Sequence, residues 1–141
     1  MSLTSILQHR KGDVVHVTPD TPVRAVVQLL ADHRIGAVPV IRDGDVLGIM
    51  SERDVIYGLR RDGAAMLEWP VERVMTKPAI TVESSITPLA CLSLMTQRRI
   101  RHLPVVDDGQ IVGFISIGDL VKARMELIEA EAEAMRAYIT G

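Results

Sequence analysis

The feature of this sequence that most constrains its fold is an internal repeat. When the chain is shifted by 65 residues without gaps, residues 15–59 fall on residues 80–124. The identical positions gather at expected turns and helix starts: Val17 and Val82, Leu29 and Leu94, Arg34-Ile35 and Arg99-Ile100, Pro39-Val40 and Pro104-Val105, Asp43-Gly44 and Asp108-Gly109, Gly48 and Gly113, Ser51 and Ser116, Asp54 and Asp119. Two copies are too few for a solenoid. We therefore expect a closed pair, related by a pseudo-twofold axis, in which the copies bury each other's sheets.

Each copy has the pattern of a β-α-β-β-α unit, which places the chain in the mixed α/β (α+β) class. The Asp-Gly pairs tolerate positive φ and predict two-residue hairpin turns. Thr21 followed by Pro22 predicts a helix cap and the first helical residue. In the first copy we expect strands at 14–17, 35–41 and 46–50, and helices from 21 to about 33 and from 51 to 59.

The repeat also sets the expected domain limits. Repeat 1 should span 10–62 and repeat 2 79–125, with a linker at 63–78, a short helix at 2–10 and an extension of the last helix over 126–141. That last helix carries apolar residues at alternating spacings of four and three, a pattern typical of paired helices. One turn of this seam should close the core of a monomer, so the remainder predicts a homodimer. The seam consists of Val121, Met125, Ile128, Ala132, Met135 and Ile139.

Each copy carries a serine and an aspartate three residues apart where its last helix begins. Ser51 with Asp54, and Ser116 with Asp119, can each form a capping box that satisfies only backbone N–H groups. A helix start also collects unpaired N–H groups and the positive end of the helix dipole, which favours a phosphate. A single occurrence would favour capping. Its repetition beside a glycine-containing strand favours a ligand site.

Composition removes several classes of function. A net charge of −2 and a pI near 6.1 argue against nucleic-acid binding through a broad basic face. No stretch approaches the ~18 apolar residues of a membrane span, and no signal peptide is recognisable, so we expect a cytoplasmic protein without membrane contact. The histidines are too scattered for a metal site, and Cys91 should be a buried, reduced thiol. Because no nucleophile–base pair or Walker-type loop occurs, we expect no enzyme activity.

Both copies resemble cystathionine β-synthase (CBS) domains, and the chain resembles a free-standing tandem CBS pair over roughly residues 10–125. The resemblance rests on Ile35-Gly36-Ala37-Val38-Pro39-Val40 with Gly48-Ile49-Met50-Ser51-Glu52-Arg53-Asp54, and on Arg101-His102-Leu103-Pro104-Val105 with Gly113-Phe114-Ile115-Ser116-Ile117-Gly118-Asp119. It implies a disc-like module whose two central clefts bind adenosine-containing ligands such as AMP, ADP, ATP, NAD or S-adenosylmethionine. In such clefts the aspartate accepts hydrogen bonds from the ribose hydroxyls, the serine faces the phosphate, and backbone groups hold the adenine.

The matching positions assign residues to two sites that each draw on both repeats. One site would combine Asp13, Val15, Ile35 and Gly36 with Arg101, His102, Phe114, Ser116, Gly118 and Asp119. The other would combine Pro78, Ile80, Ile100 and Arg101 with Ala37, Ile49, Ser51, Arg53 and Asp54. The chemistry agrees with this assignment, because a carboxylate can accept both hydroxyls of a cis-diol and arginine suits a phosphate.

The two sites should differ in strength. The second copy has Arg101-His102 where the first has Gly36-Ala37, so we expect the Ser116/Asp119 cleft to be richer in phosphate-binding groups and to fill more tightly. Arg53 offers partial compensation in the other cleft. Arg98 and Arg99 are assigned to a solvated helix end, where the dipole favours cations.

These observations predict a regulatory, ligand-sensing module that binds an adenosine nucleotide (AMP, ADP, ATP or NAD) and acts on a separate, unidentified protein target. The alternative is a protein-interaction or dimerisation scaffold whose clefts stay unoccupied and whose last helix is the working surface. RNA binding through the arginine cluster is disfavoured by the negative net charge.

Overall fold

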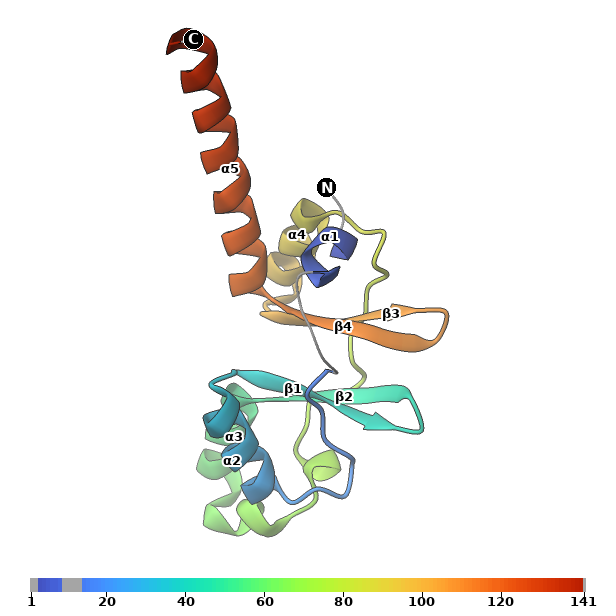
Figure 1. Cartoon of the computed structure of the whole chain (residues 1–141). Coiled ribbons are helices and arrows are strands. Elements are labelled where there is room, and N and C mark those ends of the chain that lie inside the picture. Colours follow the sequence, from blue (N-terminus) through green and yellow to red (C-terminus); the bar gives the residue numbers. More distant parts are fainter. Residues whose placement is uncertain (1–2, 9–13, 141) are drawn as a thin grey trace.

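The computed structural model describes residues 3–8 and 14–140, and it has the expected mixed α+β architecture (Figure 1). Two two-stranded antiparallel sheets lie across from one another, and helices cover the outer side of each. The elements are α1 (Leu3–Gln8), α2 (Val23–His33), β1 (Ala37–Arg42), β2 (Asp45–Ser51), α3 (Glu52–Asp62), η1 (Ala64–Glu68), η2 (Val71–Arg73), α4 (Pro88–Arg98), β3 (His102–Asp107), β4 (Gln110–Ser116) and α5 (Ile117–Thr140).

The two hairpins confirm the predicted Asp-Gly turns. Asp43 and Gly44 have φ values of 50° and 84°, and Asp108 and Gly109 have values of 51° and 74°. Positive φ at both loop residues gives a turn whose twist matches that of the flanking strands, which is why this pair closes a hairpin so well. The strands pair in the same register in both repeats. The register shifts at the equivalent place in each hairpin, between Val40 and Ile41 and between Val105 and Val106.

The prediction of a full first strand in each repeat was wrong. In place of that strand, each repeat has one residue that forms a single parallel bridge to the next strand. Val17 bridges Val40, and Val82 bridges Val105. The reason lies in the partner strand. The next bond of a parallel ladder would need an N–H group from Pro39 or Pro104, and proline has none. Each sheet consequently stops at two full strands.

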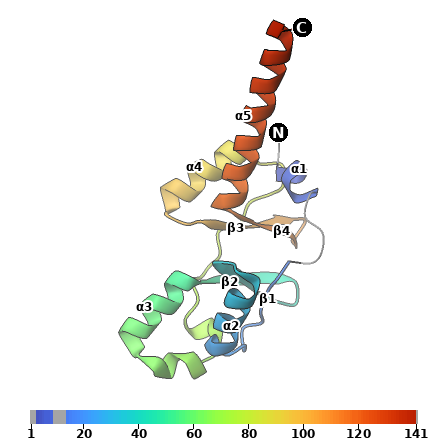
Figure 2. The same cartoon turned by 60° about the vertical axis from the view of Figure 1, so that its left-hand side comes forward.

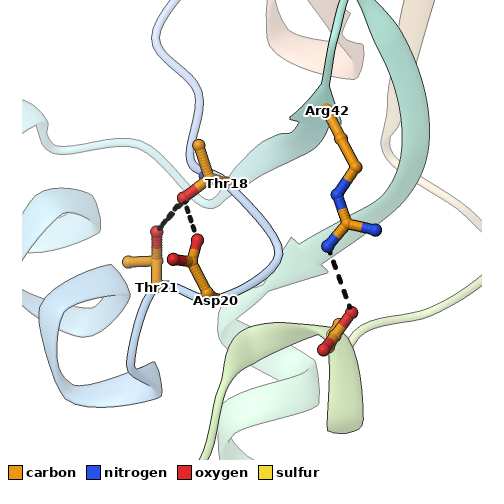
Figure 3. A network of polar contacts seen from close by, with 5 residues as sticks. Thr18, Asp20, Thr21 and Arg42 are labelled. Carbon is orange, nitrogen blue, oxygen red and sulfur yellow. Dashed lines mark hydrogen bonds and ion pairs between the residues drawn. The ribbon is translucent and has the colours of Figure 1, made fainter.

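The start of α2 also differs from expectation. The side chain of Thr21 accepts a hydrogen bond from the backbone N–H of Thr18 (3.2 Å), and the Thr18 hydroxyl donates to Asp20 (2.6 Å; Figure 3). The helix therefore begins at Val23, with Pro22 as its N-cap residue and no side-chain cap. The second repeat follows the expected pattern, since Thr87 caps α4 by accepting from the N–H of Ala90 (3.1 Å).

Each repeat has its own apolar core. Each core also contains residues from a segment that lies outside the predicted limits of that repeat. In repeat 1, Met66 of η1 and Val71 of η2 are fully buried, so the linker is part of this core. In repeat 2, Leu3 of α1 is fully buried against the core, although the sequence suggested only a separate N-terminal helix. The middle of each hairpin accommodates these segments through glycine. A Cβ atom at Gly48 would lie 2.7 Å from the Thr76 carbonyl oxygen, and one at Gly113 would clash with the side chain of Leu7.

We predict that truncating Leu3 destabilises repeat 2. Leu3→Ala removes a fully buried side chain and leaves a cavity, so the free energy of unfolding should fall by about 2–5 kcal/mol. Leu89→Ala is the matched control, because Leu89 is 72% exposed and its loss should change stability by less than about 0.5 kcal/mol. Urea denaturation of both variants measures the difference. Equal midpoints for Leu3→Ala and the wild type would show that α1 does not belong to this core.

Candidate nucleotide clefts

Two clefts open between the repeats, and each contains one Ser-x-x-Asp pair. Cleft A has a volume of about 330 Å³ and is lined by Gly36, Ile49, Ser51, Glu52, Arg53, Asp54, Tyr57, Thr76, Pro78, Ala79, Ile80, Arg99, Ile100, Arg101 and His102. Cleft B has a volume of about 580 Å³ and is lined by Leu7, Val14, Val15, Arg34, Ile35, Gly36, Ala37, His102, Val112, Gly113, Phe114, Ser116 and Asp119.

In cleft A, Asp54 is held by three hydrogen bonds. Its Oδ2 atom accepts from the backbone N–H of Ser51 (2.9 Å) and from the Ser51 hydroxyl (3.0 Å). Its Oδ1 atom accepts from the hydroxyl of Thr76 (2.9 Å), which an antiparallel bridge to Ile49 brings alongside. The N–H of Asp54 donates in return to Ser51 Oγ (3.2 Å), which completes a capping box. The pair is thus both a helix cap and part of a cleft wall.

Cleft B repeats this arrangement at the start of α5. The backbone N–H of Ser116 donates to Asp119 Oδ2 (2.8 Å), and the N–H of Asp119 donates to Ser116 Oγ (3.1 Å). Both clefts therefore present a half-buried aspartate whose orientation is fixed by its own helix start. Such fixed orientation suits a binding group, because little conformational freedom remains to be lost when a ligand arrives.

His102 forms part of the partition between the clefts. It lines both of them, as does Gly36, and its ring stacks on Phe114 with centroids 5.5 Å apart and planes 13° apart. Burial lowers the pKa of His102 below its ordinary value of 6.5. The carboxylates of Asp119 and Glu52 oppose this shift, and the guanidinium of Arg101 adds to it.

Most of the residues predicted for the two sites lie in the two clefts. Cleft A brings together Pro78, Ile80, Ile100, Arg101, Ile49, Ser51, Arg53 and Asp54, and cleft B brings together Val15, Ile35, Gly36, His102, Phe114, Ser116 and Asp119. Ala37 lines cleft B, whereas the repeat pattern had placed it in the other site. Gly118 lies in a shallow groove on the outer side of α5 beside Val121, outside cleft B. Asp13 falls outside the described residues.

The placement of Arg101 removes one reason for the expected difference between the clefts. Arg101 lines cleft A and not the Ser116/Asp119 cleft, whereas its neighbour His102 stacks on Phe114 in cleft B. Of the two neighbours, only His102 reaches both clefts. The expectation that Arg101 belongs to the Ser116/Asp119 cleft was therefore wrong, and tighter binding in that cleft stays a prediction.

The sequence reasoning also missed several lining residues. Arg99, which had been assigned to a solvated helix end, lines cleft A, and its counterpart Arg34 lines cleft B. Their match under the 65-residue shift was the available signal, because both end a helix in the left-handed region directly before an isoleucine. Tyr57 and Thr76 of cleft A have no such counterpart in the repeat, and nothing in the local pattern marked them.

Other kinds of site are not seen in the described part of the chain. Across residues 3–8 and 14–140, no three histidine, cysteine, aspartate or glutamate side chains come together as metal ligands. None of the helices in these ranges is long and apolar enough to span a bilayer. Cys91 is buried, and burial raises the pKa of its thiol.

The facing repeats with a cleft on either side of their junction define a tandem two-repeat module. The model of the CBS domain matches this chain twice, over residues 6–61 and 71–126, and the chain belongs to the CBS-domain family. It is similar to the mitochondrial CBS domain-containing protein CBSX3 of Arabidopsis thaliana, with 33% identity over 92% of this chain and 66% of that protein.

Solved structures agree with this assignment. A CBS-domain containing protein from Agrobacterium tumefaciens superposes with a TM-score of 0.84 and 40% identity, covering 88% of this chain and 99% of that one. The crystal structure of CBSX2 in complex with AMP superposes with a TM-score of 0.70 and 26% identity, covering 82% and 90% of the two chains. The predicted family and fold are thereby confirmed.

We predict that His102 titrates below pH 6.5 in the folded protein. Its folded-state pKa lies below the unfolded value, so the unfolded chain takes up the proton first as the pH falls. Stability should therefore decrease as the pH drops through about 6.5 towards the folded-state pKa. An NMR titration of the His102 ring measures the midpoint directly, and a midpoint at or above 6.5 would contradict the burial argument.

The variant His102→Phe provides the control, because it keeps an aromatic ring against Phe114 and removes the titrating group. Its loss of stability between pH 7 and pH 5.5, followed by thermal unfolding, should be smaller than that of the wild type. An equal loss in both proteins would assign the pH dependence to other residues.

Proposed function

We propose that this protein is a ligand-sensing module that binds adenosine nucleotides, such as AMP, ADP, ATP or NAD, in clefts A and B. The observation that carries the proposal is the position of Asp54 and Asp119. Each is fixed by a capping box at the junction of the two repeats and faces a cleft that residues of the other repeat complete.

The lone pairs of Asp54 suit a ribose diol. A carboxylate offers about four acceptor sites, and Ser51 and Thr76 occupy three of them. One remaining site on Oδ1 can accept a ribose hydroxyl. The Thr76 hydroxyl donates to Asp54 and can itself accept from the second hydroxyl of the diol. A sugar that lacks one hydroxyl would leave one of these acceptors unpaired, which is costly in a half-buried site.

The remaining walls of cleft A suit the other parts of a nucleotide. The isoleucines at positions 49, 80 and 100, together with Pro78, provide apolar surface for a flat base. The positive end of the α3 dipole lies at the cleft and favours a phosphate, although the N–H groups of Glu52 and Asp54 already donate to the Gly36 carbonyl oxygen and to Ser51 Oγ. Arg53 of the same helix supplies a guanidinium that matches phosphate geometry.

A relative supports the nature of the ligand. CBSX2, which is 26% identical and shares the fold, was crystallised in complex with AMP. We infer the same ligand class for this chain, and we propose that occupancy of the clefts alters the affinity for a separate protein target. The module would act as a regulator without catalytic activity of its own.

A dimerisation role has separate support from α5. Leu120 of this helix is buried against repeat 2, whereas Met125 and Ile128 on the seam are 56% and 49% exposed. The seam was expected to close the monomer core with its first turn, but Leu120 and not Val121 does so. The C-terminal half of α5 extends beyond the remaining elements in both views (Figures 1 and 2). Apolar residues at alternating spacings of four and three can pack against the same pattern on an identical helix. We therefore propose that α5 pairs with α5 of a second copy of this chain.

We predict that Asp54→Asn and Asp119→Asn each weaken nucleotide binding at one cleft. The amide largely preserves the cap but replaces one acceptor oxygen by a donor, so the affinity of the affected cleft for AMP should fall about 10- to 100-fold. Isothermal titration calorimetry on each variant measures the loss. Asp45→Asn, at an exposed position on β2, is the matched control and should bind as the wild type does. Unchanged binding by both cleft variants, or no heat with AMP, ATP or NAD in the wild type, would favour a scaffold with unoccupied clefts.

We further predict that Ile128→Glu halves the mass of the protein in solution. A charge at the centre of the seam would have to be buried between two helices, which is unfavourable without a partner. Multi-angle light scattering measures the mass. Ala130→Glu, on the same helix but off the seam, should remain dimeric. A monomeric wild type, or a dimer unaffected by Ile128→Glu, would contradict pairing through α5.

A further inference from the structure

We propose that cleft A selects nucleotides that carry two or more phosphate groups, whereas cleft B takes adenosine ligands with one phosphate or none. The inference rests on the proposed binding of adenosine nucleotides and adds the ligand class of each cleft. It begins from the distribution of arginines over the described residues 3–8 and 14–140: Arg53, Arg99 and Arg101 line cleft A, and Arg34 lines cleft B.

The three arginines of cleft A converge from separate elements. Arg53 lies in the first turn of α3, Arg99 forms the C-cap of α4, and Arg101 directly precedes β3. Within the described ranges 3–8 and 14–140, no ion pair within 4.0 Å joins any of them to a carboxylate, whereas Arg24 and Arg61 each have one. Arginines that gather at one cleft and have no ion pair there raise the local potential and attract an anion.

The carboxylates of Glu52 and Asp54 also line cleft A, so its three arginines exceed its acidic side chains by one charge. Asp54 is engaged by Ser51 and Thr76. Glu52 points to the partition, since its Oε1 atom lies 3.3 Å from the position that a Cβ of Gly36 would take. The negative charges of a bound polyphosphate would therefore meet the arginines without competition from an existing salt bridge.

Cleft B has a different balance. Among the described residues 3–8 and 14–140, its one arginine is matched by Asp119, and its histidine is kept neutral near pH 7 by burial. The stacked rings of His102 and Phe114 form an aromatic wall there. A weakly charged, partly aromatic cleft suits a nucleoside or a monophosphate better than a polyphosphate, because additional charges would be desolvated without partners.

The smaller volume of cleft A is compatible with a longer ligand. Its three arginines are exposed, which is compatible with guanidinium groups near the opening of the cavity. The base and ribose would occupy the enclosed part beside the isoleucines, and the second and third phosphates would extend outwards among the guanidinium groups. Arginine is well suited to this position, since it remains charged and forms bidentate contacts with phosphate.

Calorimetry with AMP and ATP, in the absence of Mg²⁺, tests the inference on the two single-cleft variants. In Asp119→Asn, which retains an intact cleft A, ATP should bind at least tenfold more tightly than AMP. In Asp54→Asn, which retains cleft B, this preference should be absent. Equal affinities in Asp119→Asn, or a preference for ATP confined to Asp54→Asn, would overturn the inference while leaving adenosine binding intact. Failure of either ligand to bind the wild type would instead refute the proposed function, and this inference with it.

A matched arginine pair identifies the groups responsible. Arg99→Gln should weaken ATP binding by about tenfold and AMP binding by less than about threefold, because it removes a partner of the outer phosphates. Arg98→Gln alters the neighbouring arginine, which does not line cleft A, and should change neither affinity. If Arg99→Gln lowers the affinities for ATP and AMP by the same factor, Arg99 does not contribute to the preference for polyphosphates.

Discussion

The structure depends on the mutual burial of two sheets that are too small to stand alone. A two-stranded hairpin is marginally stable in water, and each sheet here has helices on one side only. The other side faces the second repeat, where β2 contacts β4. This packing brings the ends of β2 and β4 to the junction, and Ser51 and Ser116 begin their helices there. The clefts are therefore a consequence of how the repeats cover each other.

At that junction, one aspartate of each repeat both caps a helix and lines a cleft. Asp54 and Asp119 complete the caps of α3 and α5 through one carboxylate oxygen, and each also lines a cleft. Capping and ligand binding were competing interpretations of the same motif, but the structure shows that the cap and the cleft position coexist. The cap removes conformational freedom from the carboxylate before any ligand arrives, which lowers the entropic cost of binding.

The sequence predicted the features that depend on local chemistry. The Asp-Gly hairpins and the helix starts at Ser51 and Ser116 follow from a few neighbouring residues, and the 65-residue repeat placed them in two copies. Features set by distant packing were missed. The burial of Leu3 in repeat 2 involves segments far apart in the chain, and the cleft that Arg101 lines depends on how the two repeats face each other.

The central claim is that the two aspartates recognise a ribose diol at the junction of the repeats. Titration of the wild-type protein with AMP and with 2′-deoxy-AMP tests it most directly, because the two ligands differ only in one hydroxyl. The account predicts that the deoxy compound binds at least tenfold more weakly, since an acceptor at Asp54 or Asp119 loses its partner. Equal affinities for the two ligands would contradict it.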